Sequence, residues 1–336
     1  MLRSLAVAVV AVVAVVATLT VDPLTRAAAP ADPALAAART PLLGGRLSVR
    51  LAEGMKVEAR GHSLMAADAA QEDETRAVVD KGDVRLVMMV WELYTRAGDD
   101  FAAAVKADLA AGGMAAPPAL ETPTVAAPLS ALAVTPPPPS PPRDGNVIYE
   151  AYVKQADGTV ELIAFYVSPE GLQDAARWVA LARAVVGTLE AGKRALALGG
   201  GEVAFAGAGK DKLVLTLPPG FVTATQDGPD FSVYRIRQVV TLGQPQPLCG
   251  IYLGGHPSYQ HSQRDIPADK VTTVMGVLIG VATAWHQWGD GGGTTTEAMV
   301  DHPLQPSLRV HAFCAAPTVA ERDRLQQLVS TLRVVP

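Results

Sequence analysis

A spacing pattern that occurs twice is the feature that most constrains how this chain can fold. One copy spans residues 47–55 (LSVRLAEGM) and the other spans 213–221 (LVLTLPPGF). Each copy places apolar residues at alternate positions, then two spacers, a glycine and a large apolar residue, which predicts a strand that enters a turn. Each also leads to a helical pattern that ends in a Thr-Leu pair, at 188–189 and at 331–332. The sequence therefore predicts a duplicated domain.

Length and composition agree with two folded units. The 336 residues are 49% hydrophobic and 18% charged, which supplies enough apolar surface for two separate cores. The formal net charge is -5, and the basic residues are dispersed rather than gathered in runs. Because phosphate binding requires clustered positive charge, we expect no nucleic-acid partner.

The N-terminus carries the pattern of an export signal. Arg3 precedes an uncharged run over residues 4–21, and Ala29 and Ala31 form a small-residue cleavage motif. These features predict a signal peptide over residues 1–31. The alternative is an uncleaved anchor, because about 18 apolar residues can cross a bilayer. In both cases the body of the protein is expected in the periplasm or secreted, with membrane contact only through the leader.

Composition also divides the remaining chain. We expect a flexible tether over 32–40, a first domain over 41–192, a Gly-rich linker over 193–209 and a second domain over 210–336. Within the first domain, a Pro- and Ala-rich stretch at 115–143 predicts a surface loop. The expected fold class is α+β, with each domain an antiparallel sheet packed by a C-terminal helix.

Local signals place several elements of the first domain. The apolar run over 84–94 predicts a central strand. Asp99 or Asp100 is expected to cap a helix that follows it. Asp157-Gly158 lies between two strand-like runs and predicts a hairpin. Ser168 is expected to cap the closing helix of this domain, with a proline in its first turn.

In the second domain, Thr318 is expected to cap the last helix, and Glu321 completes a capping box with it. The strand candidates of this domain are residues 231–241, 248–253, 274–288, 294–300 and 308–315.

These patterns resemble a known family. The repeated opening and the final amphipathic helix that ends in Thr-Leu look like the PsbP-like fold. The strand with Ala-Trp-His-Gln-Trp at 284–288, its Gly-rich loop and the Val-His-Ala-Phe strand at 310–313 are similar to periplasmic immunity proteins that neutralise secreted phospholipase toxins. This resemblance implies a non-catalytic binding protein with another protein as its partner, a secreted toxin being the candidate. No active site of the family can be carried over, because the sequence has no matching catalytic motif, and we expect no cofactor.

A binding site is predicted around the paired tryptophans of the second domain. Trp285, His286, Trp288 and Asp290 lie close together at the end of a strand and in its loop. Aromatic side chains offer a large contact area and are enriched at the centres of protein interfaces. The alternative is that either tryptophan packs the core of the sheet.

Five of the six histidines lie in the second domain, which raises a metal-dependent hydrolase as an alternative function. No His-Glu-x-x-His or Cys-x-x-Cys motif accompanies them, so we interpret them as unrelated surface and edge histidines and predict no metal site. No Gly-x-Ser-x-Gly motif is present either, and we predict no catalytic residue. A carrier of a small apolar molecule in a cleft between sheet and helix is a further alternative. The five are His256, His261, His286, His302 and His311.

Cys249 and Cys314 are the only cysteines of the chain. Two cysteines in one exported domain are candidates for a disulfide. The alternative is two buried thiols that act as small apolar side chains.

Overall fold

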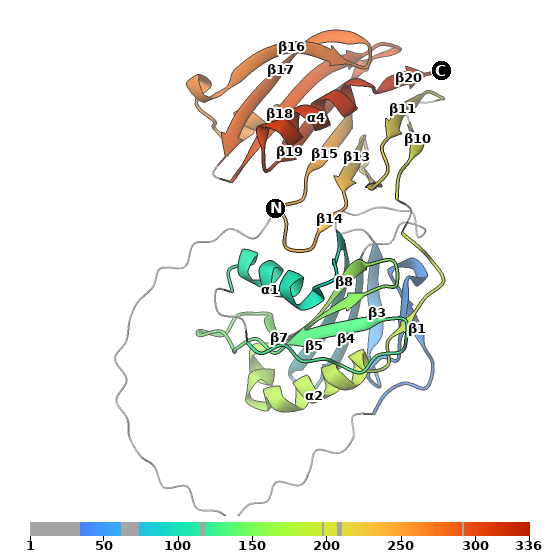
Figure 1. The fold of residues 1–336 in the computed structure, drawn as a ribbon, viewed down its shortest axis with the longest axis vertical. Helices are drawn as coiled ribbons and strands as arrows, with labels where there is room; N and C mark the ends of the chain where they lie inside the picture. The colour runs from blue at the N-terminus through green and yellow to red at the C-terminus, as the bar shows by residue number, and fades with distance from the viewer. Residues whose placement is uncertain (1–33, 62–73, 115–117, 197, 207–209, 291) are drawn as a thin grey trace, which may run out of the picture.

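The computed structural model describes residues 34–61, 74–114, 118–196, 198–206, 210–290 and 292–336. The predicted signal peptide lies outside these residues. The described chain is a mixed protein of helices and antiparallel sheets (Figure 1). None of its described helices has the length and apolar character needed to cross a membrane.

The first half of the chain runs to residue 191. Its elements are β1 (Thr40–Leu42), η1 (Leu43–Gly45), β2 (Leu47–Val49), β3 (Lys56–Gly61), β4 (Glu74–Lys81), β5 (Val84–Arg96), α1 (Phe101–Ala111), β6 (Ser130–Val134), β7 (Asn146–Lys154), β8 (Thr159–Val167), η3 (Pro169–Asp174), α2 (Ala175–Val186) and β9 (Glu190–Ala191).

The second half begins at residue 201. Its elements are β10 (Gly201–Ala206), β11 (Lys212–Leu217), β12 (Phe221–Asp227), β13 (Phe231–Gln238), β14 (Val240–Thr241), β15 (Leu248–Gly254), α3 (Gln260–Gln263), η4 (Ala268–Lys270), β16 (Thr272–Leu278), β17 (Val281–Asp290), β18 (Gly293–His302), β19 (Gln305–Ala316), α4 (Val319–Ser330) and β20 (Arg333–Val335).

Both halves follow a similar order of strands. A three-stranded sheet has the order β1-β2-β9 in the first half and β10-β11-β20 in the second. The large sheets have the orders β3-β4-β5-β8-β7-β6 and β12-β13-β15-β19-β18-β17-β16. The second half has one strand more because the run over 274–288, which we expected to be a single strand, folds back on itself. The turn lies at Ile279 and Gly280, which have φ angles of 49° and 80°.

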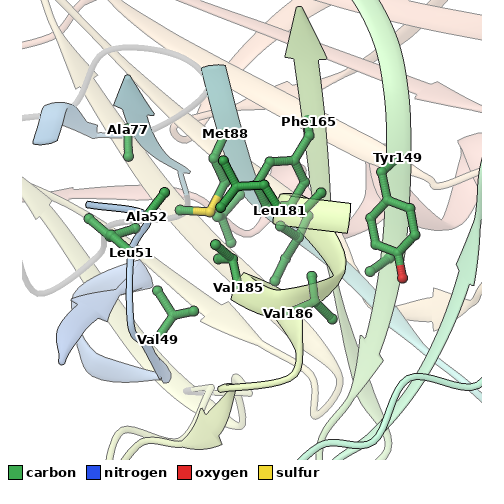
Figure 2. Close-up of a cluster of buried hydrophobic side chains, with 14 of the residues drawn as sticks. Val49, Leu51, Ala52, Ala77, Met88, Tyr149, Phe165, Leu181, Val185 and Val186 are labelled. Carbon is green, nitrogen blue, oxygen red and sulfur yellow. The ribbon is translucent and has the colours of Figure 1, made fainter. Parts of the chain in front are cut away.

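Helices cover both faces of the large sheet in the first half. Successive side chains of β8 point to opposite faces of the sheet. Ile163 and Phe165 pack in the cluster that contains the side chains of α2, whereas Leu162 packs in the cluster that contains those of α1. Figure 2 shows Phe165 beside Leu181 and Val185 of α2. A sheet with two covered faces can be apolar on both, which explains the nearly continuous apolar run of β8.

In the second half, helix α4 covers only one face of the large sheet. Leu325 and Val329 of α4 belong to the same buried cluster as Ile251, Trp285 and Val310 of the strands. Gln326 of α4 adds polar contacts, because its Oε1 accepts hydrogen bonds from Gln287 Nε2 at 2.9 Å and Thr296 Oγ1 at 3.0 Å. The sheet face that points away from α4 carries the candidate site described below.

A short strand joins the two halves. β4 pairs with β5 only as far as Trp91, and β14 of the second half pairs in parallel with the end of β5 at Thr95 and Arg96. Leu242, which follows β14, packs in the cluster around α1. Gln246 Nε2 then donates a hydrogen bond to Tyr94 O at 2.9 Å. The second half therefore contributes to the core of the first.

Three predicted loop or tether segments contain ordered structure. The segment expected as a Pro-rich loop, 115–143, includes β6, which pairs with β7 and buries Ala131 and Ala133. The expected linker includes β10, which pairs with β11. In the expected tether, Leu35 bridges to Ala52 and packs on the first core. Composition alone did not reveal these segments, because a high content of Pro, Ala and Gly is typical of loops and does not show that β6 pairs with β7 or β10 with β11.

The predicted helix caps were mostly correct. The Asp100 side chain accepts a hydrogen bond from Ala103 N, and the Thr318 hydroxyl accepts one from Glu321 N. Ser168 stands at the N-cap position with Pro169 after it, as expected, but its side chain makes no capping hydrogen bond. The chain there enters a 3-10 turn, and the Ser168 hydroxyl accepts from Arg85 N at 3.2 Å instead.

The two cysteines are joined. Cys249 of β15 and Cys314 of β19 lie directly opposite each other in the antiparallel ladder and form a disulfide on the α4 side of the sheet. Disulfides persist in oxidising compartments, so this bond is compatible with a place outside the cytoplasm.

Removing this disulfide is expected to destabilise the protein. It closes a loop of 65 residues, for which the chain-entropy estimate is about 4 kcal/mol. We expect the double variant Cys249→Ser, Cys314→Ser to lose a free energy of unfolding of that order, measured by urea denaturation. Reductant should lower the stability of the wild type and leave the variant unchanged. Two titratable thiols in denatured, non-reduced wild type would contradict the prediction.

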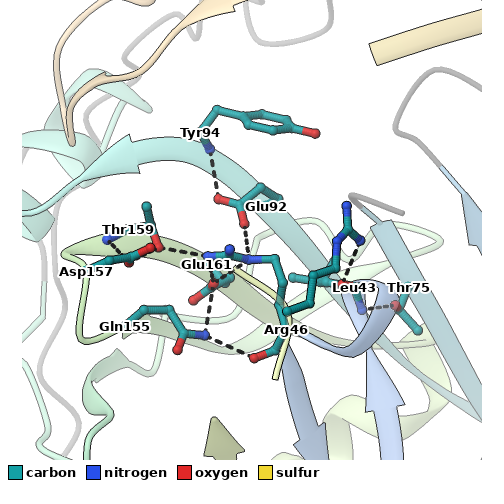
Figure 3. A network of polar contacts seen from close by, with 10 residues as sticks. Leu43, Arg46, Thr75, Glu92, Tyr94, Gln155, Asp157, Thr159 and Glu161 are labelled. Atoms are coloured by element: carbon teal, nitrogen blue, oxygen red, sulfur yellow. Dashed lines mark hydrogen bonds and ion pairs between the residues drawn. The ribbon is translucent and has the colours of Figure 1, made fainter. Parts of the chain in front are cut away.

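A buried ionic network connects Arg46, which lies between η1 and β2, to the large sheet of the first half (Figure 3). Arg46 lies 2.7 Å from Glu92 Oε2 of β5 and 2.8 Å from Glu161 Oε1 of β8. Two further hydrogen bonds complete the network. Gln155 Nε2 donates to Glu161, and Thr159 Oγ1 accepts from Arg46. The side chains of Arg46 and both glutamates are at most 2% exposed, so the network is closed to solvent and is structural.

One arginine cannot balance two buried carboxylates. Burial and the neighbouring Glu92 raise the pKa of Glu161, against the opposing effect of Arg46, to about 8. The raised pKa favours the protonated form of Glu161 in the folded protein.

This raised pKa predicts a pH-dependent stability. A carboxyl group with a raised folded-state pKa contributes its full stability below its ordinary value of 4.5, and loses it as the pH rises toward about 8. We expect Glu161→Gln, which stays neutral, to show a smaller loss of unfolding free energy over this pH range than the wild type. The exposed Glu53→Gln is the control for the change of charge. Equal pH slopes for Glu161→Gln and the wild type would refute the assignment.

Candidate functional site

The candidate site lies on the face of the second large sheet that points away from α4, which we call the open face. In the first half, α1 follows the third strand, β5, and covers the corresponding face. In the second half, residues 255–271 follow the third strand, β15, and contain only the four-residue α3 and the short turn η4. Side chains on the open face are therefore mostly half-buried or exposed. They include Phe231, Val233, Arg235, Tyr252, Thr273, Met275, His286, Met299, Arg309 and Phe313.

Glycines make room for aromatic rings on this face. Phe313 of β19 lies over Gly250, where an added Cβ would stand 2.1 Å from the ring. Tyr252 stacks on Phe231 with ring centroids 5.4 Å apart, and an added Cβ at Gly254 would meet both side chains. The aromatic rings therefore lie close against the sheet and are held by it.

A buried carboxylate organises the centre of the open face. Glu297 of β18 is fully buried. His261 Nδ1 lies 2.6 Å from its Oε1, and His311 Nε2 lies 2.7 Å from its Oε2. The backbone N–H groups of Gln260 and His261 donate to the same carboxylate at 2.8 and 3.0 Å. Four donors thus satisfy one buried charge, as a buried carboxylate requires.

These donors decide the charge of Glu297. Burial acts to raise the pKa of Glu297, but the hydrogen bonds from His311, from the two backbone N–H groups and from the His261 ring together lower it to about 2. Glu297 is therefore ionised at neutral pH, and an ionised carboxylate only accepts hydrogen bonds. Each histidine must place a proton on the nitrogen that faces Glu297, which fixes the orientation of both rings.

Further rings pack around this pair. Tyr259 contacts His261, His286 and His311, with ring centroids 5.2, 5.1 and 5.9 Å away. His286 lies 4.9 Å from His261, centroid to centroid, and its Nδ1 is 3.2 Å from Thr273 Oγ1. Burial lowers the pKa of His286 and the nearby His261 lowers it further, which favours the neutral imidazole. We refer to Tyr259, His261, His286, Trp288, Glu297 and His311 as the Glu297 cluster.

A surface pocket adjoins the cluster. It measures about 600 Å³, and His261 and Thr273 lie on its wall together with residues of the 255–271 segment. A second pocket, of about 550 Å³, lies near the start of α4 between Trp288 and Arg322. The linings of both mix polar and apolar side chains, and neither is the apolar cleft expected for a carrier.

The structure divides the four residues predicted as a binding site. Trp285 is fully buried on the α4 face, in the core cluster of the second half. His286 and Trp288 lie on the open face, where Trp288 is 3% exposed and its ring centroid is 5.8 Å from that of His261. Asp290 ends β17, and its side chain lies outside the described residues. His286 is thus the predicted residue that combines exposure with a place in the cluster.

The histidines are more closely related than the sequence indicated. The sequence indicated unrelated surface and edge histidines. In the structure, His261, His286 and His311 all contact Tyr259. His256 is exposed in the loop after β15, and His302 is buried where β18 ends. Among the described residues, no group of three or more His, Cys, Asp or Glu is placed to hold a metal ion. The metal-dependent hydrolase therefore gains no ligand set from this part of the chain.

Sequence reasoning missed the residue at the centre of the cluster. Glu297 is the only charged residue in the run Gly-Thr-Thr-Thr-Glu-Ala-Met-Val at 293–300. A single charge within an uncharged strand is a signal that could have pointed to a buried, partnered carboxylate. Its partners could not have been found, because Gln260 and His261 precede it by more than 30 residues.

The fold and the site together define a protein of two similar halves, in which antiparallel sheets pack against helices and one sheet face of the second half is left open. No protein-family model, curated protein or solved structure matches the chain.

Loss of the Glu297 charge is expected to destabilise the second half. In Glu297→Gln an amide replaces the carboxylate, so one of the four donors faces an NH₂ group, which costs roughly 2–3 kcal/mol at neutral pH. Because the pKa of Glu297 is lowered, its contribution is present above the ordinary value of 4.5 and is lost as the pH falls toward about 2. The stabilities of the two proteins, measured by urea denaturation, should therefore converge over this range.

The exposed Asp269→Asn is the matched control, and its stability should track that of the wild type. A constant difference between wild type and Glu297→Gln from neutral pH down to about 2 would show that Glu297 does not carry this charge.

Proposed function

We propose that this chain is an exported, non-catalytic binding protein of the cell envelope, and that its partner is another protein held on the open face of the second half. The observation that carries this proposal is the open face itself. In the first half α1 covers the corresponding sheet face, whereas in the second half this face carries half-buried aromatic rings and only the four-residue α3 lies against it. Such faces serve as interaction surfaces.

The Glu297 cluster fits the centre of such an interface. Tyr259 and His286 are half-buried, so part of each ring is available to a partner. Their positions are held by His261, Thr273 and the buried carboxylate behind them, and a surface that is already ordered loses little entropy on binding. The adjacent pocket of about 600 Å³ can receive a side chain of the partner.

The finer proposal is that the partner is a secreted toxin enzyme and that binding inhibits it. This part rests on the resemblance of the tryptophan strand, its Gly-rich loop and the 310–313 strand to periplasmic immunity proteins. The predicted export signal agrees with it, since an inhibitor of a secreted toxin must be present where the toxin arrives. An occluding inhibitor needs no catalytic group of its own.

Binding to the purified partner tests the proposal. The chain from residue 32 onward would capture the partner from an envelope extract, mass spectrometry would identify it, and affinity would then be measured with the purified pair. Tyr259→Ala and His286→Ala should each weaken binding by about tenfold or more, as for residues at the centre of an interface. Gln327→Ala, on the exposed side of α4, is the matched control and should bind as the wild type does.

If both open-face variants and the control bind equally well, the partner does not use this face. If the partner is an enzyme and stays fully active when saturated with the chain, the inhibitor proposal fails although binding stands.

A further inference from the structure

The last strand of the second sheet has an unusually bare edge. β16 (Thr272–Leu278) ends the strand order and, within the described residues, pairs only with β17. Its sequence Thr-Thr-Val-Met-Gly-Val-Leu has no charge and no proline, and its register with β17 is regular over all seven residues. Met275 is 74% exposed and Val277 is 42% exposed.

The other edges of the large sheets carry the usual protection against strand pairing. β3 contains charged residues and a bulge between Val57 and Ala59. The outer side of β6 is occupied by Glu121, which exchanges two backbone hydrogen bonds with Ala133. β12 is rich in polar residues and ends at Asp227. Proteins protect edge strands because an unprotected edge pairs with another strand. We therefore expect the unprotected edge of β16 to pair with an occupant, which is a strand of another chain.

We propose that this occupant is β16 of a second copy of the chain, paired antiparallel about a two-fold axis at Met275. This register pairs the whole strand with itself. Met275 faces Met275, Thr273 faces Val277, Val274 faces Gly276, and Thr272 faces Leu278. No like charges meet, because Lys270 of one copy comes opposite Gly280 of the other. Pairing of apolar and β-branched side chains across such a ladder is stabilising.

The two-fold axis at Met275 is perpendicular to the sheet, so it leaves both open faces on the same side. The dimer would be one continuous sheet of two seven-stranded halves, with both α4 helices behind it. Met275 and Val277 of the two copies would form a shared apolar strip between the two Glu297 clusters. Because the contact is a single short strand, we expect a dimer that depends on concentration.

Sedimentation velocity of the chain from residue 32 onward, over a series of concentrations in the micromolar range, tests this dimer. The wild type should shift from monomer to dimer as concentration rises. Met275→Lys places two like charges at the centre of the pairing and should leave a monomer. Leu304→Lys is the matched control, because Leu304 is 52% exposed in the turn after β18, away from the edge, and this variant should still dimerise.

A covalent test checks the register. Met275→Cys brings two thiols opposite each other and should give a disulfide-linked dimer on mild oxidation, whereas Leu304→Cys should not. A wild type that stays monomeric throughout, a Met275→Lys variant that dimerises like the wild type, or a Met275→Cys variant that does not cross-link would each overturn the proposal. The proposal would also be overturned if the wild type stays monomeric and the Met275→Lys variant no longer binds the partner of the open face. In that case β16 binds that partner instead of a second copy.

Discussion

An antiparallel sheet has two faces, and what covers the second face decides the character of each half of this protein. In the first half, α2 and α1 cover both faces, and the strands between them are apolar on both sides. In the second half, α4 covers one face and a segment without a long helix crosses the other. The features that distinguish the second half, its stacked rings, its buried Glu297 and its bare edge strand, all belong to the sheet face or edge that no long helix covers.

Two buried carboxylate networks show how similar chemistry leads to different roles. In the first half, two glutamates share Arg46 in a network that is closed to solvent, and the raised pKa of Glu161 favours its protonated form. In the second half, Glu297 keeps its charge because four donors surround it, and two of these are histidine rings. The second network reaches the surface through His261, whose side chain is 19% exposed, and therefore can contribute to binding where the first cannot.

Patterns carried by neighbouring residues were predictable from the sequence, and contacts between distant residues were not. The repeated opening, the hairpin at Asp157-Gly158 and the caps at Asp100 and Thr318 follow from local spacing and hydrogen bonding. The strands β6 and β10 lie in segments rich in Pro, Ala or Gly, a composition typical of loops, and each pairs with the strand that follows it in the chain. Trp285 and His286 look like one site in the sequence, yet alternation places them on opposite faces of the sheet. The Glu297 cluster gathers residues from four segments of the chain, and no local signal links them.

The disulfide links the core of the second half to the candidate site on the open face. Cys249 and Cys314 cross-link β15 and β19 from the α4 side of the sheet. The neighbouring pair of the ladder, Gly250 and Phe313, faces the opposite side. Phe313 lies over Gly250 on the open face, so the covalent bond is directly behind an aromatic contact of the candidate site. β19 also carries His311, whose ring donates to Glu297. The bond therefore fixes the spacing of the two strands that support the open face, and a site built on strands held in this way presents its side chains in one arrangement before any partner arrives. The affinity for a partner then depends on surface complementarity, because little of the binding free energy is spent on ordering the site.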